Sequence, residues 1–400
     1  MKLVIKLFIV APLLFPISVS SQILNDAPPL PKDVPSSSEP SKAKSQIEFY
    51  ASEYGVSAAE ALRRMKVMRK AGILADKLHS SSIEDFGGIE VIHKPEFTVV
   101  IRFTGDFGAK VKALGLGQGY IGAPAVESWR LSKARQNAVG DTLRKAGVVY
   151  QSTLKPDGTL DLFVENKDAA MVSVLLSAAD IDGLDRVTVT PQTKIKTPGN
   201  GYGESRVVGG DLVYGYEGSC SAGFTVYQSG NSNNRYILTA GHCENNLWHD
   251  SISLPYVGER YAIYQPYDFQ WHTKGTHDVL SNVKKNGATA TLEITAMYPP
   301  AYMVVGEYVC KYGAYTFKTC GNIYSTNVDM LGDGGKFVQV RSSTGANLSS
   351  EGDSGAPWFN ETFQEGWGVH SNEGPSAPND AVFMPLVRIR DVGLELLTVP

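Results

Sequence analysis

The stretch that decides the fold reads SAGFTVYQSGNSNNRYILTAGHC, residues 221–243. Two short runs rich in β-branched and aromatic residues, SAGFTVYQ and NRYILTA, surround the polar turn SGNSNN. Further runs follow as RYAIYQ, ATATLEI, VGEYVCKY, KFVQVRS and EGWGVHS, with turns such as LGDGG between them. Regular short strands separated by turn residues predict an all-β sandwich or barrel for the second half of the chain.

Length and composition place the chain among ordinary globular proteins. It has 400 residues, of which 42% are hydrophobic and 20% are charged, and this length predicts two or three domains. The formal net charge of −4 does not provide the positive charge that nucleic acids and acidic membranes attract. We therefore expect neither kind of partner.

The first residues predict export. Residues 1–21 begin with Lys2 and Lys6, continue as an apolar run interrupted by Pro12 and Pro16, and end in serines. This is the pattern of a cleavable signal peptide. An uncleaved anchor is the alternative, but the run is short and broken for a membrane span. After signal cleavage we expect a secreted, extracellular protein with no membrane attachment.

The chain divides into segments of different character. Residues 22–45 are rich in proline and serine and predict a flexible linker. Residues 46–195 predict two α+β units that contain no cysteine. A second polar linker, residues 196–206, separates these units from the β-rich residues 207–400.

The cysteines predict disulfides. Cys220, Cys243, Cys310 and Cys320 make an even number in a chain that we expect to be exported, which favours two disulfides over a metal site. Four cysteines allow three pairings, and the compact pairing is Cys220–Cys243 with Cys310–Cys320. No Cys-x-x-Cys spacing indicates zinc. We expect no metal and no cofactor.

A candidate nucleophile, Ser354, lies in EGDSGAPW near the end of the chain. A serine hydroxyl needs a neutral imidazole to take its proton and an acid to hold that imidazole in the right tautomer. His242 follows the apolar run YILTA and is expected where a strand ends, beside a cysteine that can fix the turn. His249, His272 and His277 lie in polar sequence, and we expect them to lack such anchoring.

Together, TAGHC and GDSGAP resemble the chymotrypsin-like serine peptidases, and within them the α-lytic protease and streptogrisin branch. RVVGGDLVYGYEGSCSAGFTVY at 206–227 is similar to that branch's mature start, VCKYGAYTFKTCG at 309–321 to its disulfide hairpin, and DFGGIEVIHKPEFTVVIRFTGD at 85–106 to its pro region. The resemblance implies two antiparallel β-barrels for the peptidase domain, residues 207–400, with the catalytic residues between them. It also implies a two-part pro region over residues 46–195.

The resemblance further implies catalytic roles. Ser354 would be the nucleophile and His242 the general base. The orienting acid is expected at Asp268, which lies beside aromatic residues at the end of a strand, in the family's position. The alternatives are Asp250, which is close to His242 in sequence, and Asp278, which lies in a polar run.

The residues around the serine have implied roles as well. The backbone N–H groups of Gly352 and Ser354 would form an oxyanion hole. Asp353 would form a buried ion pair that shapes the loop. Its expected partner is Lys311, a position that is basic in the α-lytic branch, and the alternative is a freed N-terminus at Val207.

The strand GVHSNEG is expected to bind an extended peptide as an added strand. Its predicted substrate-binding residues are His370, Ser371, Asn372 and Glu373. In the resemblance His370 faces the primary specificity pocket, where glutamate-specific relatives also have a histidine, whereas Glu373 would repel an acidic side chain. Acidic, aromatic and small side chains are therefore all candidates. The cysteine that many members carry just before Glu351 is missing here, which implies a pocket wall with fewer cross-links.

These inferences predict a secreted serine endopeptidase, made as a zymogen, that cleaves protein or peptide substrates through an acyl-enzyme. The pro region is implied to act as an intramolecular chaperone and inhibitor, to be removed between Thr197 and Arg206, and the enzyme is expected to be a monomer. The alternative is a catalytically inactive, secreted binding protein on the same fold.

Overall fold

The computed structural model describes Pro28 and residues 44–81, 83–192, 206–261, 267–286, 290–330, 336–375 and 378–399. The predicted signal peptide, most of the first linker and all of the second linker except Arg206 lie outside these ranges. Within the described ranges, no helix combines the length and the apolar character that crossing a membrane requires.

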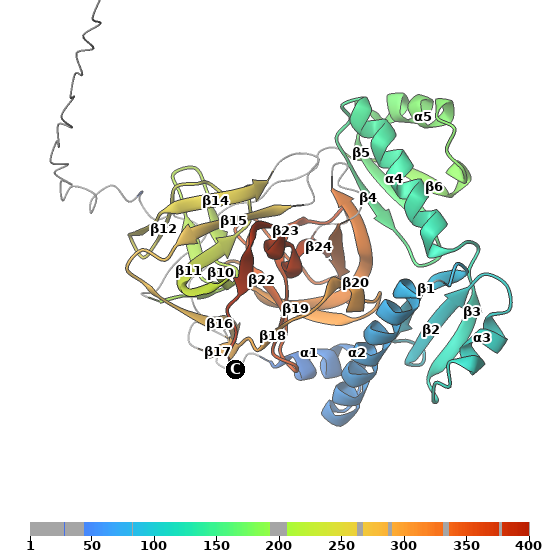
Figure 1. Cartoon of the computed structure of the whole chain (residues 1–400), viewed down its shortest axis with the longest axis horizontal. Helices are drawn as coiled ribbons and strands as arrows, with labels where there is room; N and C mark the ends of the chain where they lie inside the picture. The colour runs from blue at the N-terminus through green and yellow to red at the C-terminus, as the bar shows by residue number, and fades with distance from the viewer. Residues whose placement is uncertain are drawn as a thin grey trace, which may run out of the picture.

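The N-terminal half forms two α+β units beside the β-rich half (Figure 1). The first unit contains α1 (Gln46–Tyr54), α2 (Ala58–Ser80), β1 (Phe86–Ile92), β2 (Thr98–Phe103), α3 (Phe107–Ala113) and β3 (Tyr120–Pro124). Its strands form one sheet in the order β1-β2-β3. The Ser57 side chain caps α2 by accepting a hydrogen bond from the Glu60 amide, and the helix buries Met65 and Met68 in the core.

The second unit continues a sheet of the β-rich half. It contains α4 (Trp129–Lys145), β4 (Tyr150–Leu154), β5 (Leu160–Glu165), α5 (Ala169–Ala178), η2 (Leu184–Arg186) and β6 (Val187–Gln192). Leu143, Tyr150, Leu162 and Val172 belong to its own apolar core. β4 pairs antiparallel with β20 (Phe317–Met330), so the strands of the two halves share one sheet.

The first part of the β-rich half contains β7 (Arg206–Gly209), β8 (Leu212–Tyr214), β9 (Ser219–Ser221), β10 (Thr225–Gln228), β11 (Asn231–Thr239), β12 (Leu247–His249), β13 (Ile252–Leu254), β14 (Tyr256–Tyr261), β15 (Asp268–Thr273), β16 (Asp278–Asn286) and β17 (Ala290–Glu293). They form three sheets, ordered β14-β15-β11-β10-β25, β13-β12-β8-β9 and β17-β16-β7, where β25 is Leu394–Leu396. One apolar core that includes Val207, Val213, Ile237 and Val279 joins all three sheets.

The second part is a closed barrel. It contains β18 (Ala296–Met297), η3 (Pro300–Tyr302), β19 (Tyr308–Gly313), β20, β21 (Phe337–Arg341), β22 (Pro357–Asn360), β23 (Glu365–Glu373), β24 (Asp380–Pro385) and η4 (Leu386–Val392). The strand order β19-β22-β23-β24-β21-β20 closes on itself because β19 also pairs with β20. The predicted fold, an all-β half preceded by α+β units, is confirmed. The first part, however, is three sheets around a shared core, whereas the second is one closed sheet.

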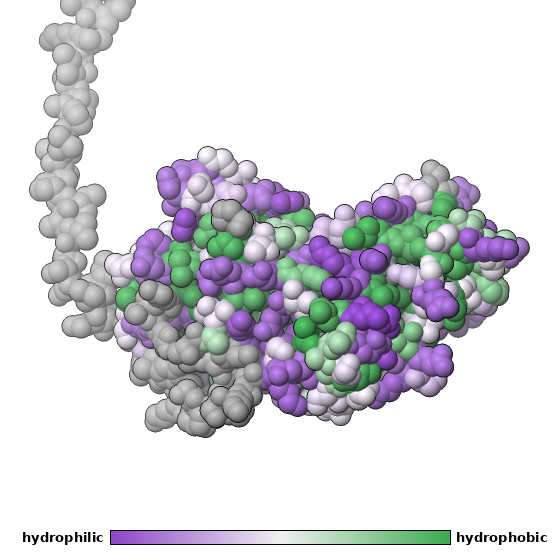
Figure 2. Space-filling model, turned by 90° about the horizontal axis from the view of Figure 1, so that it is seen from below, coloured by the Kyte–Doolittle hydropathy of each residue, from purple (hydrophilic) through white to green (hydrophobic). Residues whose placement is uncertain are grey.

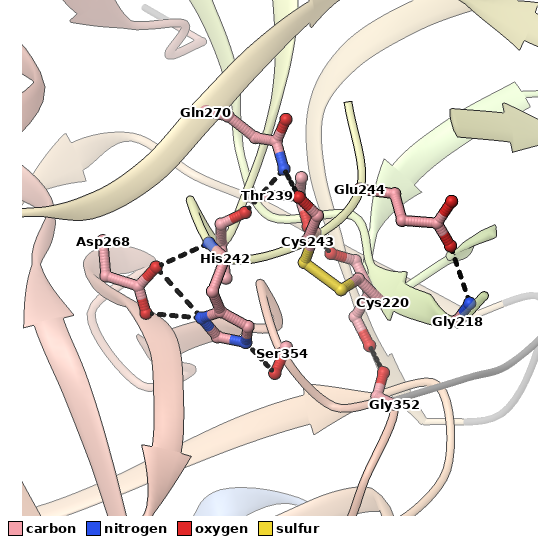
Figure 3. The surroundings of a disulfide bond; sticks show 12 residues. Gly218, Cys220, Thr239, His242, Cys243, Glu244, Asp268, Gln270, Gly352 and Ser354 are labelled. Carbon is pink, nitrogen blue, oxygen red and sulfur yellow. Dashed lines mark hydrogen bonds and ion pairs between the residues drawn. A yellow bond between two sulfur atoms is a disulfide. The ribbon is translucent and has the colours of Figure 1, made fainter. Parts of the chain in front are cut away.

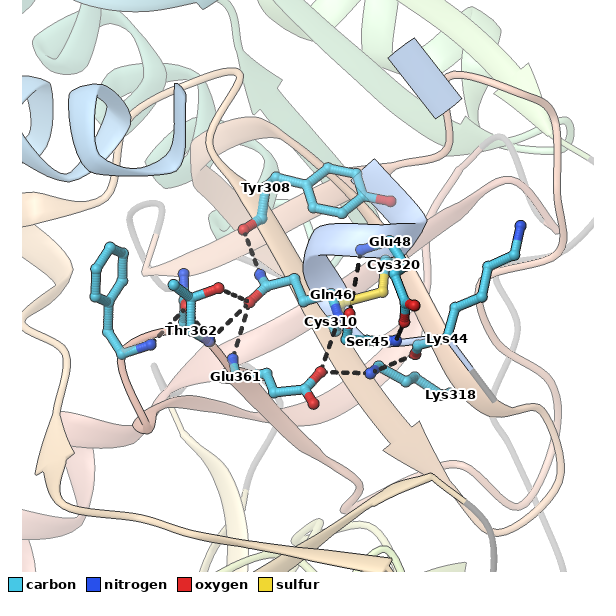
Figure 4. Close-up of polar contacts among 12 residues, drawn as sticks. Lys44, Ser45, Gln46, Glu48, Tyr308, Cys310, Lys318, Cys320, Glu361 and Thr362 are labelled. Carbon is cyan, nitrogen blue, oxygen red and sulfur yellow. Dashed lines mark hydrogen bonds and ion pairs between the residues drawn. A yellow bond between two sulfur atoms is a disulfide. The ribbon is translucent and has the colours of Figure 1, made fainter. Parts of the chain in front are cut away.

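Helix α1 docks on the β19–β20 hairpin through buried polar groups (Figure 4). Gln46 is fully buried; its Nε2 donates to Tyr308 O at 3.0 Å, and its Oε1 accepts from Glu361 N at 2.9 Å. Lys318 Nζ donates to Lys44 O at 2.9 Å and to Glu361 Oε2 at 2.5 Å. The helix is thereby attached to the hairpin and to the turn after β22 by specific contacts beside the Lys318–Glu361 ion pair.

The surface mixes hydrophilic and hydrophobic side chains (Figure 2). Large apolar side chains are exposed on the second α+β unit, where Leu131 of α4 is 56% exposed and Val174 of α5 is 69% exposed. This unit therefore does not bury all of its apolar surface against the β-rich half.

Candidate active site

His242, Asp268 and Ser354 meet between the two parts of the β-rich half (Figure 3). His242 follows β11, Asp268 begins β15, and Ser354 precedes β22. His242 Nδ1 lies 2.9 Å and 3.1 Å from the two Asp268 carboxylate oxygens, and its Nε2 lies 2.9 Å from Ser354 Oγ. A carboxylate only accepts hydrogen bonds, so Nδ1 carries the proton and Nε2 can accept the serine hydroxyl.

The Asp268 carboxylate is buried and fully engaged. It is 4% exposed and accepts hydrogen bonds from the His242 backbone amide at 3.1 Å and from the Ser371 hydroxyl. Burial alone would raise the pKa of Asp268, but the charge and hydrogen bonds of His242, together with Ser371, hold that pKa below its usual value. The carboxylate therefore stays ionised.

The loop that carries His242 is fixed on both sides. Gln270 Nε2 donates to Ala240 O at 2.9 Å and to Cys243 O at 2.8 Å, so one side chain holds the residues before and after the histidine. The disulfide Cys220–Cys243 ties the same loop to β9. The second disulfide, Cys310–Cys320, lies across the β19–β20 hairpin.

The loop that carries Ser354 depends on glycine. Gly352 has φ of 95° and Gly355 has φ of 88°, and such values favour glycine because it has no Cβ. A Cβ on Gly355 would lie 2.2 Å from Thr239 Oγ1 and 2.3 Å from Ser221 O. Within the part of the chain that the structure describes, the amides of Gly352 and Ser354 have no hydrogen-bond acceptor.

Asp353 forms a buried ion pair. Lys311 Nζ lies 2.7 Å from Asp353 Oδ2, and neither residue is exposed. The Thr316 hydroxyl donates to the same oxygen, and the amides of Tyr315 and Thr316 donate to Oδ1 at 3.0 Å and 3.1 Å. Burial would raise the pKa of Asp353, but Lys311 and these hydrogen bonds lower it. Val207, the alternative partner, lies in β7 beside β16.

His370 lies on β23 and is fully buried. Trp358 Nε1 donates to its Nδ1 at 3.4 Å; because the indole nitrogen is a donor only, the imidazole carries its proton on Nε2. Among the described residues, Nε2 has no hydrogen-bond partner. Burial, and then the charge of Lys311, lower the pKa of His370 to about 3, so this histidine is neutral.

Ser371, Asn372 and Glu373 end β23, which pairs with β24 along one edge. On the other edge, β22 pairs with β23 from Glu365 to Val369. No strand of the described structure covers this edge from Ser371 onward. Ser371 was predicted only as a substrate contact, but its hydroxyl donates a hydrogen bond to the Asp268 carboxylate.

The prediction for the other three histidines of this half was wrong. His249, His272 and His277 are all buried. His249 Nδ1 lies 2.7 Å from Leu212 O, and His272 Nδ1 lies 2.8 Å from Leu254 O. They are part of the framework, because short strands bury residues whose neighbours in sequence are polar.

Gln270 was missed by sequence reasoning. It lies two residues after Asp268 on β15, and side chains at i and i+2 of a strand share a face. That spacing is the signal that would have placed Gln270 beside the His242 loop. In the described part of the chain, no group of histidine, cysteine and acidic side chains is arranged to hold a metal ion.

The fold and this site define the class of chymotrypsin-like serine peptidases, and comparisons with known proteins agree. No protein-family model matches the chain. Serine protease 1 of Streptomyces fradiae is 31% identical over 219 residues, 53% of this chain and 55% of that protein, so the chain spans about half of that relative's length. Glutamyl endopeptidase 2 of Streptomyces griseus is 30% identical over 190 residues, 46% of this chain and 94% of that protein.

Solved structures give matches over a similar share of the chain. Protease A of Thermobifida fusca is 24% identical, with a TM-score of 0.40, and covers 48% of this chain and 100% of its own. A glutamic-acid-specific serine protease described as using a histidine triad in substrate binding is 25% identical, with the same TM-score and coverage. On the identity and coverage of the Streptomyces griseus relative, the chain belongs to the chymotrypsin-like serine peptidases of the α-lytic protease and streptogrisin type.

Proposed function

We propose that the chain is a secreted serine endopeptidase made as a zymogen, with Ser354, His242 and Asp268 as its catalytic triad. The observation that supports this most strongly is the line of hydrogen bonds from Asp268 through His242 to Ser354. A serine in this arrangement can lose its proton to a neutral imidazole whose other nitrogen is held by an ionised carboxylate.

The mechanism follows from these contacts. Ser354 Oγ attacks the scissile carbonyl carbon as its proton passes to His242 Nε2. Asp268 stabilises the imidazolium, which then protonates the leaving amine, and the C–N bond breaks to leave an acyl-enzyme on Ser354. A water molecule, deprotonated by the same nitrogen, hydrolyses the ester and restores the serine.

The amides of Gly352 and Ser354 are proposed to stabilise the tetrahedral intermediate. Neither amide has an acceptor within the described residues, and the positive φ of Gly352 favours a residue without Cβ. Removing one such donor typically costs roughly 3 kcal/mol of transition-state stabilisation. The ion pair between Asp353 and Lys311 stabilises the conformation of this loop and takes no part in proton transfer.

Residues 46–195 are proposed to be a pro region that assists folding and blocks the active site. The docking of α1 on the disulfide hairpin and the pairing of β4 with β20 support an association with the β-rich half, which both proposed roles require. Cleavage between Thr197 and Arg206 would release the peptidase domain, residues 207–400, as a secreted monomer. N-terminal sequencing of mature protein is expected to find a start near Val207, and a start before residue 150 would contradict the assignment.

For specificity we propose that His370 helps select an acidic side chain. Its Nε2–H is a buried donor without an acceptor among the described residues, and a carboxylate would supply one. A relative named glutamyl endopeptidase favours the same choice, whereas the nearby Glu373 opposes it. Cleavage of a mixed peptide library tests this: cuts after acidic residues support it, and cuts after aromatic or small residues contradict it.

The proposed activity is tested by casein hydrolysis with secreted protein. The parent is expected to cleave casein, and Ser354→Ala is expected to be inert. If the folded, processed parent does not cleave casein or any member of the peptide library, the chain is a binding protein on this fold instead.

A further inference from the structure

We infer that Ser221 is a positioning residue for the oxyanion hole, an inference that rests on the proposed peptidase activity. Ser221 ends β9, is fully buried, and directly follows the disulfide cysteine Cys220. It does not belong to the triad, and within the described residues its hydroxyl makes hydrogen bonds with Gly352 and Ala314 rather than with His242 or Asp268. Both of these hydrogen bonds are with backbone groups.

Ser221 holds the nucleophile loop on both sides of Asp353. Its hydroxyl donates to Gly352 O at 2.8 Å, and its backbone amide donates to Ser354 O at 2.6 Å. The same hydroxyl accepts from Ala314 N at 3.0 Å, so both its donor and an acceptor position are used. One residue therefore fixes the carbonyl groups of the two residues whose amides would bind the oxyanion.

The loop needs this restraint because a glycine residue restricts the backbone conformation very little. Gly352 has φ of 95°, and glycine populates both signs of φ readily. Rotation about the N–Cα bond of Gly352 would turn its N–H relative to its carbonyl group. Because the Ser221 hydroxyl holds this carbonyl group, any rotation that displaces the carbonyl group breaks a buried hydrogen bond, which opposes it.

Ser221 also connects the nucleophile loop to the loop of the general base. Its carbonyl oxygen accepts from Thr239 Oγ1 at 2.9 Å, and Thr239 ends β11, three residues before His242. Cys220 reaches the same loop through its disulfide with Cys243. The segment Cys220–Ser221 thus sets the oxyanion donors and the base relative to one another.

Loss of the Ser221 hydroxyl is expected to weaken transition-state stabilisation and leave ground-state binding unchanged. Removing a whole oxyanion donor lowers kcat by about 10²–10³-fold. Ser221→Ala loosens a donor without deleting it, so we expect kcat to fall about tenfold with KM within about twofold of the parent, since an interaction made only in the transition state changes kcat.

The test measures how strongly the enzyme stabilises an oxyanion at the site. The probe is a peptidyl chloromethyl ketone with ¹³C at the ketone carbon, carrying the best-cleaved residue of the peptide library. Ser354 adds to the ketone, His242 displaces chloride, and ¹³C NMR gives the pKa of the resulting hemiketal hydroxyl. In Ser221→Ala this pKa is expected to rise by about one pH unit, the equivalent of a tenfold loss of stabilisation.

Ser219→Ala is the matched control. Ser219 lies two residues away on the same strand and is 2% exposed, and its hydroxyl has no hydrogen-bond partner among the described residues. Its removal is expected to leave kcat and the hemiketal pKa unchanged. Ser221→Thr, which keeps the hydroxyl, is expected to restore the parent's pKa.

Each outcome decides one question. If the parent forms no adduct, the proposed peptidase activity fails. If the parent forms the adduct but Ser221→Ala has the same kcat and hemiketal pKa, the positioning role alone is overturned. If Ser221→Ala does not accumulate as mature protein, Ser221→Gly, which also lacks the hydroxyl, is measured instead. A lower kcat and a raised hemiketal pKa then support the positioning role, and unchanged values overturn it.

Discussion

Asp268 and Asp353 are two buried carboxylates near the same serine, and they differ in what their partners can do. Each lies within 2.9 Å of a basic nitrogen, and each has a lowered pKa because the charge of that base and several hydrogen bonds outweigh burial. The partner of Asp268 is an imidazole whose second nitrogen reaches Ser354. The partner of Asp353 is an ammonium, which also donates to the Thr316 hydroxyl.

The difference shows that a buried ion pair by itself does not make a catalytic site. His242 can accept a proton at Nε2 while Asp268 holds Nδ1, so the pair can pass a proton to and from the serine. Lys311 has donors only, so the other pair can only hold the loop in shape. We therefore predict that substitution of Asp268 lowers activity, whereas substitution of Asp353 lowers stability.

The largest expected effect is on activity, in Asp268→Asn. An asparagine has an N–H group that would face His242 Nδ1 and favour the wrong tautomer, and kcat is expected to fall by about 10⁴, as in other triads of this kind. The melting temperature is expected to change less than in Asp353→Asn, because the partner left behind is an imidazole that can be neutral and not a buried ammonium. Steady-state kinetics with active-site titration measures kcat, and calorimetry measures the melting temperature.

The second effect is on stability, in Asp353→Asn. This change leaves Lys311 as an unpaired buried charge, and breaking a buried pair in this way typically costs about 3–5 kcal/mol. Urea unfolding of the Ser354→Ala zymogen, with and without Asp353→Asn, measures the difference. Equal free energies of unfolding would show that the ion pair does not hold the loop.

A partly buried histidine whose hydrogen-bond partners are uncharged extends the comparison. His93 Nε2 donates to Gly306 O at 2.6 Å, and its Nδ1 accepts from Tyr50 OH at 2.7 Å, at the contact between the first unit and the β-rich half. Burial, together with the charges of Arg64 and Lys94, lowers the pKa of His93 to about 4, although the Gly306 carbonyl opposes this.

Stability of the zymogen is therefore expected to fall as the pH falls. Between about 6.5 and 4 the unfolded chain binds a proton on this residue that the folded chain does not, which costs up to about 3 kcal/mol. Urea unfolding of the Ser354→Ala zymogen at pH 7, 5.5 and 4 is expected to show a smaller pH dependence for His93→Gln. Identical pH dependence in both would rule out this contribution.

The smallest expected effect is in Ser371→Ala. This change removes one hydrogen bond to the Asp268 carboxylate and leaves the contacts of His242 in place. The net worth of such a bond is about 1 kcal/mol, so kcat is expected to fall about fivefold, with the acidic limb of the pH–rate profile moved upward. An unchanged profile would mean that Ser371 does not support the acid.

The residues with the strongest local signal were predictable from sequence. TAGHC and GDSGAP place His242 and Ser354 in recognisable turns, and the four cysteines have one compact pairing, which the structure contains. The helical and strand segments of the first half also follow from their periodicity.

Features that depend on contacts between distant segments could not be predicted. The burial of His249, His272 and His277, and the hold of Gln270 on the His242 loop, arise only when the strands pair. The same holds for Ser221, because nothing in its neighbouring sequence indicates that Gly352 will lie against its hydroxyl.

Covalent labelling of the nucleophile tests the central claim most directly. The mature protein is treated with a fluorophosphonate, digested and analysed by mass spectrometry, with His242→Ala, matured by added active parent enzyme, as the comparison. We predict stoichiometric modification of Ser354 in the parent and a rate of modification lower by several orders of magnitude in His242→Ala, because the base is gone. No label on Ser354, or equal labelling of both proteins, would contradict it.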